Sequence, residues 1–104
     1  MNISNNFGFK IPKNISNECD GKDIFEQINL LNLAIFEDIK INHETRLQRQ
    51  SELLAYSNSQ GINLSSAYIL NLISQTNIQL GNLSAALDSS MKAQSKWKTV
   101  KEEK

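Results

Sequence analysis

The sequence has few of the residues that mark several common classes of protein. Its 104 residues include one cysteine, Cys19, and one histidine, His43. A single cysteine excludes an internal disulfide, and one histidine in a polar stretch is too little for a zinc site. The four glycines are isolated, so the sequence has no glycine-rich phosphate loop. These absences predict no catalytic residue, no metal ligand and no cofactor, and therefore a protein that is not an enzyme.

An excess of one charge and long apolar runs are also lacking. The chain carries 11 basic and 11 acidic residues, so its net charge is zero. Nucleic acids and anionic membranes select basic surfaces, and we expect the chain to bind neither. The longest apolar run is too short to insert into a membrane, and residues 1–6 do not resemble a signal peptide. The sequence predicts a soluble cytoplasmic protein, and secretion by a route that needs no signal peptide remains compatible with it.

The N-terminal 21 residues differ in composition from the rest. They are rich in Asn and Lys, contain Pro12, Gly8 and Gly21, and show no helical or strand period. We interpret residues 1–21 as a flexible, disordered arm. Its apolar residues fall at odd positions, so the arm could instead add to a partner's sheet edge or pack on the protein's own core.

The remainder is predicted to be all-α. Residues 22–100 are expected to form the helical domain and residues 101–104 a polar tail. Asp23 and Glu26 resemble a capping box, and apolar residues at helical spacing then predict a helix to about Lys40. These are Ile24, Ile28, Leu31 and Ile35.

Polar residues then divide the chain into further helices. Asn42 is placed to cap a second helix that extends to about Tyr56. Residues 57–61 are the clearest loop, and Asn63 or Ser65 is placed to cap the next helix.

Two interpretations compete at Gly81. Residues 65–98 form either one long helix with a heptad seam or two helices that meet at Gly81 and Asn82. Inside a helix Gly costs about 1 kcal/mol relative to Ala, whereas Gly after a helix and Asn before the next are favourable. The break is therefore favoured, and it predicts about four helices in antiparallel hairpins.

Residues 67–93 resemble a tetratricopeptide repeat, a helix–turn–helix unit of about 34 residues. The matching positions are Leu70, Ile73, Ser74, Gly81, Leu83, Ala86 and Ala93. Asn77 and Ser90 stand where the repeat usually has aromatic residues, and no proline closes the unit. The resemblance implies a repeat-like hairpin that binds a helix or an extended segment of another protein.

A second resemblance belongs to the one-helix interpretation. A disordered arm followed by helices and a long heptad-like helix looks like the small subunits of bacterial secretion needles and rods. This resemblance implies a self-assembling structural subunit.

Three large amphipathic side chains are the candidate partner-binding residues, because Tyr and Trp are frequent at interface hot spots. They are Tyr56, Tyr68 and Trp97. Together with the absence of catalytic motifs, they predict a non-enzymatic adaptor or chaperone-like module that binds another protein. The alternative is self-association as a subunit of a bacterial secretion apparatus.

Overall fold

The computed structural model describes residues 2–103, and it is helical throughout with no strand in that range. The elements are a 3-10 helix η1 (Ile3–Asn5) and the α-helices α1 (Lys13–Cys19), α2 (Ile24–Glu37), α3 (His43–Ser59), α4 (Asn63–Gln79) and α5 (Leu83–Glu102). The all-α prediction is confirmed.

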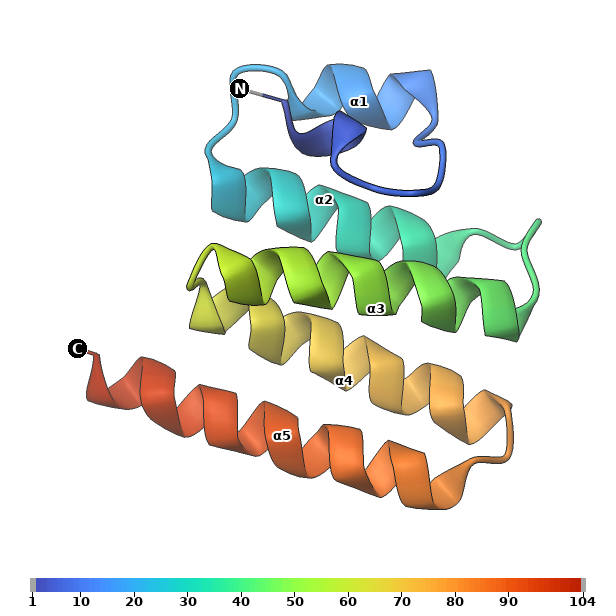
Figure 1. The fold of residues 1–104 in the computed structure, drawn as a ribbon, viewed down its shortest axis with the longest axis vertical. Coiled ribbons are helices and arrows are strands. Elements are labelled where there is room, and N and C mark those ends of the chain that lie inside the picture. The colour runs from blue at the N-terminus through green and yellow to red at the C-terminus, as the bar shows by residue number, and fades with distance from the viewer. Residues whose placement is uncertain (1, 104) are drawn as a thin grey trace.

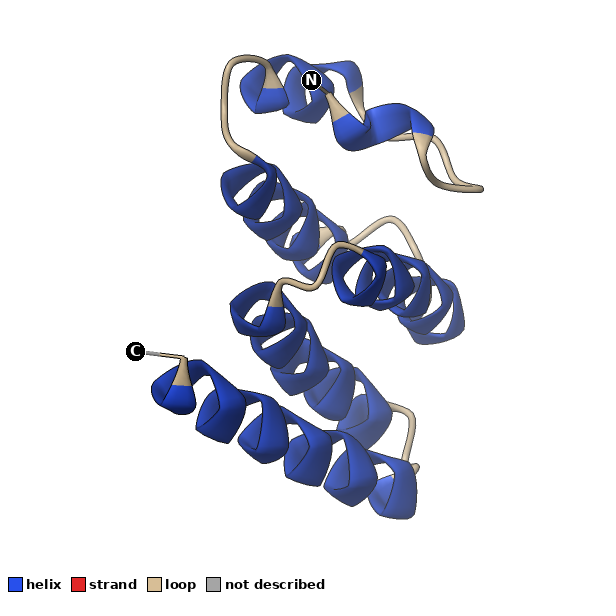
Figure 2. Cartoon of the chain, turned by 60° about the vertical axis from the view of Figure 1, so that its left-hand side comes forward, coloured by secondary structure: helices blue, strands red, loops and turns tan. Residues whose placement is uncertain are grey.

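The four long helices form a row in which each packs against the next (Figure 1). α2 also contacts α4, so the row is folded rather than flat, as the turned view shows (Figure 2). η1 and α1 pack on α2 at the start of the row, and α5 is its last member. The molecule measures 38 × 35 × 18 Å.

Side-chain caps begin two of the helices as predicted. The Asp23 carboxylate accepts a hydrogen bond from the Glu26 backbone N–H at 2.8 Å, and the Asn42 side chain accepts one from Thr45 N–H at 2.7 Å. The cap predicted for α4 is wrong, because Ile62 occupies that position and offers no side-chain acceptor. Helices α2 and α3 end at Glu37 and Ser59, each within three residues of the predicted end.

Two turns with the same geometry separate α3 from α4 and α4 from α5. Gly61 and Gly81 adopt φ of 70° and 80°, and both follow a helix of 17 residues. The N–H of the residue after each glycine bonds back to a carbonyl five positions earlier, Ser57 O in one turn and Asn77 O in the other. This is the Schellman arrangement that favours glycine. Residues 65–98 are therefore two helices, the interpretation that local energetics favoured.

The apolar core lies between η1, the segment leading to α1, and α2, α3 and α4. Its fully buried members are Ile3, Ile11, Ile28, Leu31, Ile35, Leu53, Ile69 and Ile73. Three of the four residues in the predicted stripe of α2 are among them, and Ile24 is half-buried at the edge.

The structure does not confirm a disordered N-terminal arm. Ile3, Ile11 and Cys19 are 2%, 8% and 0% exposed. The Ile3 N–H donates to the Gln27 side chain at 2.9 Å, and the Gly8 N–H donates to the Glu52 carboxylate at 2.8 Å. A few well-spaced apolar residues thus hold residues 2–20 on α2 and α3, although the segment has no regular period. Met1 of the predicted arm lies outside the described residues.

The predicted boundary before the polar tail is also displaced. α5 extends through Lys101 to Glu102, two residues into the segment predicted as a tail. Lys104 lies outside the described residues.

Candidate protein-binding surface

α5 contacts α4 through small side chains. Ala86, Ser89 and Ala93 are the buried residues of α5. The Ser74 hydroxyl of α4 donates to the Ala86 carbonyl at 2.9 Å and lies 2.7 Å from the Ser90 hydroxyl. Small residues let two helix backbones approach closely, and the hydrogen bonds keep the serine hydroxyls satisfied. Leu83, Leu87 and Met91 of α5 are consequently not needed for this contact.

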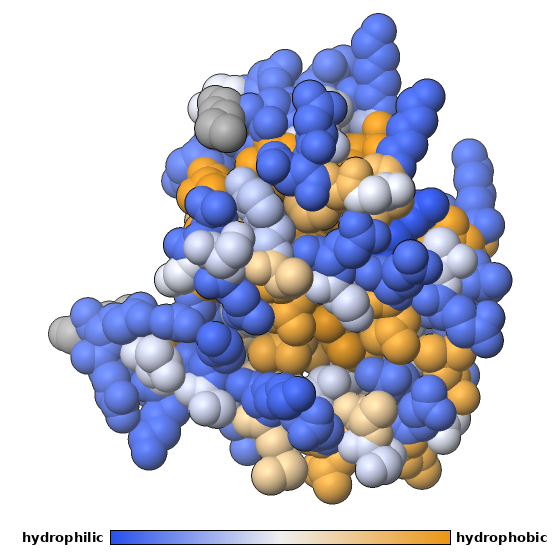
Figure 3. Space-filling view, viewed as in Figure 1, coloured by the Kyte–Doolittle hydropathy of each residue, from blue (hydrophilic) through white to orange (hydrophobic). Residues whose placement is uncertain are grey.

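Those large residues are exposed instead. Leu83, Leu87 and Met91 follow one another at four-residue spacing and are 67%, 63% and 61% exposed. Residues four apart lie on the same side of a helix, so they form a continuous strip, here called the α5 stripe. In the space-filling view, apolar side chains gather along the lower edge of the molecule, over α5 (Figure 3). Exposed apolar strips of this kind mark interaction surfaces.

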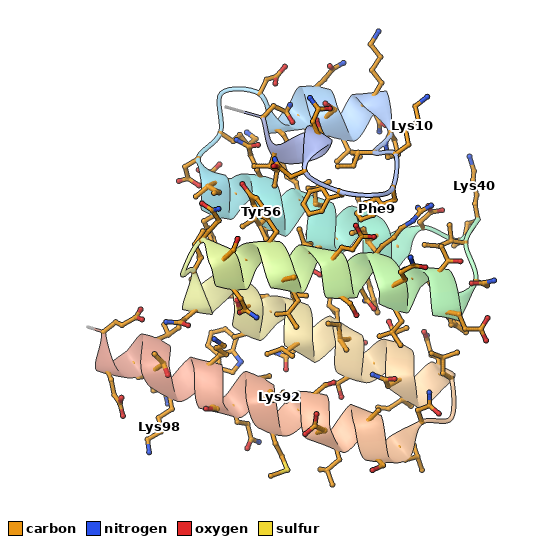
Figure 4. The ribbon with its side chains drawn as sticks, viewed as in Figure 1. Phe9, Lys10, Lys40, Tyr56, Lys92 and Lys98 are labelled. Atoms are coloured by element: carbon orange, nitrogen blue, oxygen red, sulfur yellow. The ribbon has the colours of Figure 1, made fainter. Side chains whose placement is uncertain are left out.

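The charges of α5 change along its length. Beside the stripe, Asp88 and Lys92 form an ion pair at 3.0 Å, so this part is locally neutral. Towards the C-terminal end, Lys98 and Lys101 make no ion pair or side-chain hydrogen bond within residues 2–103. Lys98 projects from the edge of α5 that is turned away from α4 (Figure 4). The apolar stripe thus continues into a cationic end.

A chain of aromatic rings crosses three helices. Trp97 of α5 meets Tyr68 of α4 edge-to-face, with ring centroids 5.0 Å apart and an interplanar angle of 89°. Tyr68 in turn lies 6.5 Å from Phe25 of α2. Trp97 and Phe25 are half-buried, and Tyr68 is 42% exposed. Aromatic pairs add about 0.5–1.5 kcal/mol beyond their buried area, so this aromatic row links α5 to α4 and α4 to α2 while its middle ring remains accessible.

Tyr56, the third predicted residue, lies elsewhere. It packs on the apolar core and meets Phe7 edge-to-face at 5.5 Å. In Figure 4 it lies near the start of α2, close to the N-terminal segment. The structure therefore brings Tyr68 and Trp97 together and separates Tyr56 from them.

Sequence reasoning missed two parts of this surface. Phe25 was not singled out, and no sequence pattern joins it to a residue 43 positions later. Leu83, Leu87 and Met91 share helical spacing with Ala86 and Trp97, so spacing alone does not separate the exposed side of this helix from the packed side. The useful signal was residue size, since the small residues mark the side that packs closely and the large ones a neighbouring side.

Polar and ionisable groups elsewhere serve the fold. Arg46 is buried and donates to the carbonyls of Ile35, Asp38 and Ile41 and to Nδ1 of His43 at 2.7 Å. His43 thus helps to hold the connection between α2 and α3. Burial raises the pKa of the Cys19 thiol, and the nearby Asp20 and Glu18 carboxylates add to the shift.

Two kinds of special site are absent from residues 2–103. No group of three His, Cys, Asp or Glu side chains is placed to hold a metal ion. None of the helices there has both the length and the apolar character needed to cross a membrane.

Comparison of the chain with family models, curated proteins and solved structures finds no match. The α5 stripe and the aromatic row are therefore interpreted from their own geometry.

Proposed function

We propose that the chain is a non-enzymatic protein-binding module, of the adaptor or chaperone-like kind, that holds its partner on α5. The observation that carries this proposal is the α5 stripe. Three large apolar side chains more than 60% exposed form one strip on a helix whose main packing partner is α4. Full burial of one such side chain is favourable by about 1.5–3 kcal/mol, so covering the strip would drive association.

The repeated turns support a repeat-like arrangement of hairpins. The same hydrogen bonds occur at Gly61 and at Gly81, 20 residues apart. Each helix of such an array buries one side on the previous helix and offers the other side to the next. In this proposal, the partner occupies the side of α5 that a following helix would cover.

A photo-crosslinking amino acid placed at Met91 tests the proposal in the cell that makes the protein. We expect the crosslinker to capture a defined protein. We expect Leu87→Gln in the same chain to abolish that product, because Gln removes the apolar contact but is itself a good helix former. The matched control places the crosslinker at Ala85, which is exposed on another side of α5 and outside the stripe.

Two results would count against the proposal: equal products from Met91 and Ala85, and a product that survives Leu87→Gln. A product consisting of two copies of this chain would replace the adaptor with the alternative, a self-assembling subunit.

A further inference from the structure

The chemistry of the α5 stripe restricts what can cover it. The backbone C=O groups of the stripe residues and the N–H groups of Leu87 and Met91 are bonded within α5, and the stripe side chains offer no hydrogen-bond donor. An extended segment laid on this strip would bury its own backbone polar groups without partners, at a cost in free energy. A helix satisfies its backbone internally, so a helix is the occupant that fits.

The length of the stripe sets the size of the contact. Leu83 and Met91 are eight residues apart, which corresponds to about 12 Å along a helix. Two to three turns of a partner helix cover the stripe, with apolar residues at three- and four-residue spacing facing α5. About five turns reach from Leu83 to Lys101, which is 18 residues further on. A short amphipathic helix is sufficient, and a large folded surface is not required.

The charges at the C-terminal end of α5 indicate the direction of the partner helix and the sign of its charge. Lys98 and Lys101 lie beyond Met91, on the helix positions that continue the stripe, and both are exposed without an ion pair in the described part of the chain. Acidic side chains are most favourable in the first turn of a helix. A partner that runs antiparallel to α5 brings its first turn beside these two lysines, and it also places the two helix dipoles in opposite directions.

A second copy of the chain fits this surface less well. In a parallel pairing of two α5 helices, Lys98 would face Lys98. Like charges across an interface oppose association. In an antiparallel pairing centred on Leu87, Lys98 and Lys101 would lie beyond the start of α5 in the other copy, so this pairing gives them no acidic partner on that helix. Stable dimers also bury about 1,200–2,000 Å², and three aliphatic side chains per copy, each already partly covered, fall short of that.

We infer that α5 binds a short amphipathic helix of another protein, antiparallel to α5, with acidic residues in its first turn and apolar residues along the stripe. This inference rests on the proposed function and adds the class of partner.

The test uses synthetic peptides and the whole chain, with binding followed by fluorescence anisotropy at low salt. The first peptide has about 18 residues, leucines at three- and four-residue spacing, and glutamates in its first turn. The second carries lysines in place of these glutamates, and the third carries the glutamates in its last turn. We expect the first peptide to bind most tightly.

Variants of the chain assign the contacts. Leu87→Gln should weaken binding of the first peptide by about ten-fold, and Ala85→Gln should leave it unchanged. The double change Lys98→Glu and Lys101→Glu should weaken it by about three- to ten-fold, with the difference shrinking as salt is added. Circular dichroism and melting of each variant verify that the fold is kept.

Each contrary result overturns a stated part of the inference. Equal affinity for the first two peptides overturns the acidic first turn, and tighter binding of the third overturns the antiparallel direction. Binding by none of them, or binding insensitive to Leu87→Gln, overturns the helical occupant. Dimerisation of the chain that Leu87→Gln abolishes would assign the stripe to a second copy. The crosslink from Met91 tests the proposed function separately. A crosslinked product without binding of any peptide would support a protein-binding module and would reject an amphipathic helix as its partner.

Discussion

The two ends of the helix row differ in how their apolar side chains are covered. At the first end, α2 is covered by η1, α1 and the segment between them, which contribute the buried Ile3, Cys19 and Ile11. At the other end, α5 leaves Leu83, Leu87 and Met91 exposed. Rows of amphipathic helices need a polar or covered surface at each end to remain soluble. The described chain supplies one such cover, and the open end is the surface that we propose for the partner.

Removing the cover should have the largest effect. Deletion of residues 1–20 exposes the apolar side of α2, and we expect the free energy of unfolding to fall by about 3 kcal/mol or more. Urea titration followed by circular dichroism measures this loss. Asn17→Ala, an exposed change inside the cover, should stay within about 0.5 kcal/mol of the parent. A deletion variant with an unchanged midpoint would show that residues 2–20 do not stabilise the row.

A matched pair of leucines compares the two ends directly. Leu31→Ala in α2 removes a side chain that is 1% exposed, and we expect a loss of about 2–4 kcal/mol. Leu87→Ala in α5 removes one that is 63% exposed, with an expected change within about 0.5 kcal/mol. Equal losses in urea titrations would mean that the stripe is packed in solution.

The turn before α5 should respond more weakly. Gly81 has φ of 80°, where a Cβ atom is unfavourable. Gly81→Ala is expected to destabilise the fold by about 1 kcal/mol, and Gly81→Asn by less, because Asn tolerates this conformation better. Thermal melts of both variants provide the check, and a stabilised Ala variant would instead support one continuous helix.

The smallest expected effect concerns Cys19 at the covered end. Its pKa in the folded protein is raised above the ordinary value of about 9 by burial and by Asp20 and Glu18. As pH rises, the unfolded state loses the thiol proton first. The stabilisation is therefore complete below pH of about 9 and declines above it. Urea midpoints near pH 8 and pH 10 should show this decline, and Cys19→Ala should flatten it.

Local signals in the sequence predicted the four long helices, α2 to α5, but neither η1 nor α1. Asp23 and Asn42 begin helices because their side chains accept backbone N–H bonds, a property that depends only on nearby residues. The break at Gly81 followed from the costs of Gly and Asn inside a helix. In each case the relevant energies are local and can be estimated from the sequence.

Long-range packing could not be predicted in the same way. Ile3 and Ile11 have no period to reveal them, and their burial depends on the side of α2 that happens to face them. The candidate site was predicted only in part for the same reason. Residue type alone singled out Tyr68, Trp97 and Tyr56, but the contact between the first two, and the separation of Tyr56 from them, depend on how the helices pack.

The small-residue contact between α4 and α5 also has a consequence for motion. Alanine and serine bring backbones together but remove little apolar area from water, so less hydrophobic free energy opposes separation of α5 than opposes separation of α2 or α3. Segments held by few buried apolar contacts open locally at a lower free energy than the rest of a fold. The backbone amides of α5 should therefore exchange with solvent deuterium through local opening, before those of α2 and α3, and a bound partner should slow that exchange most.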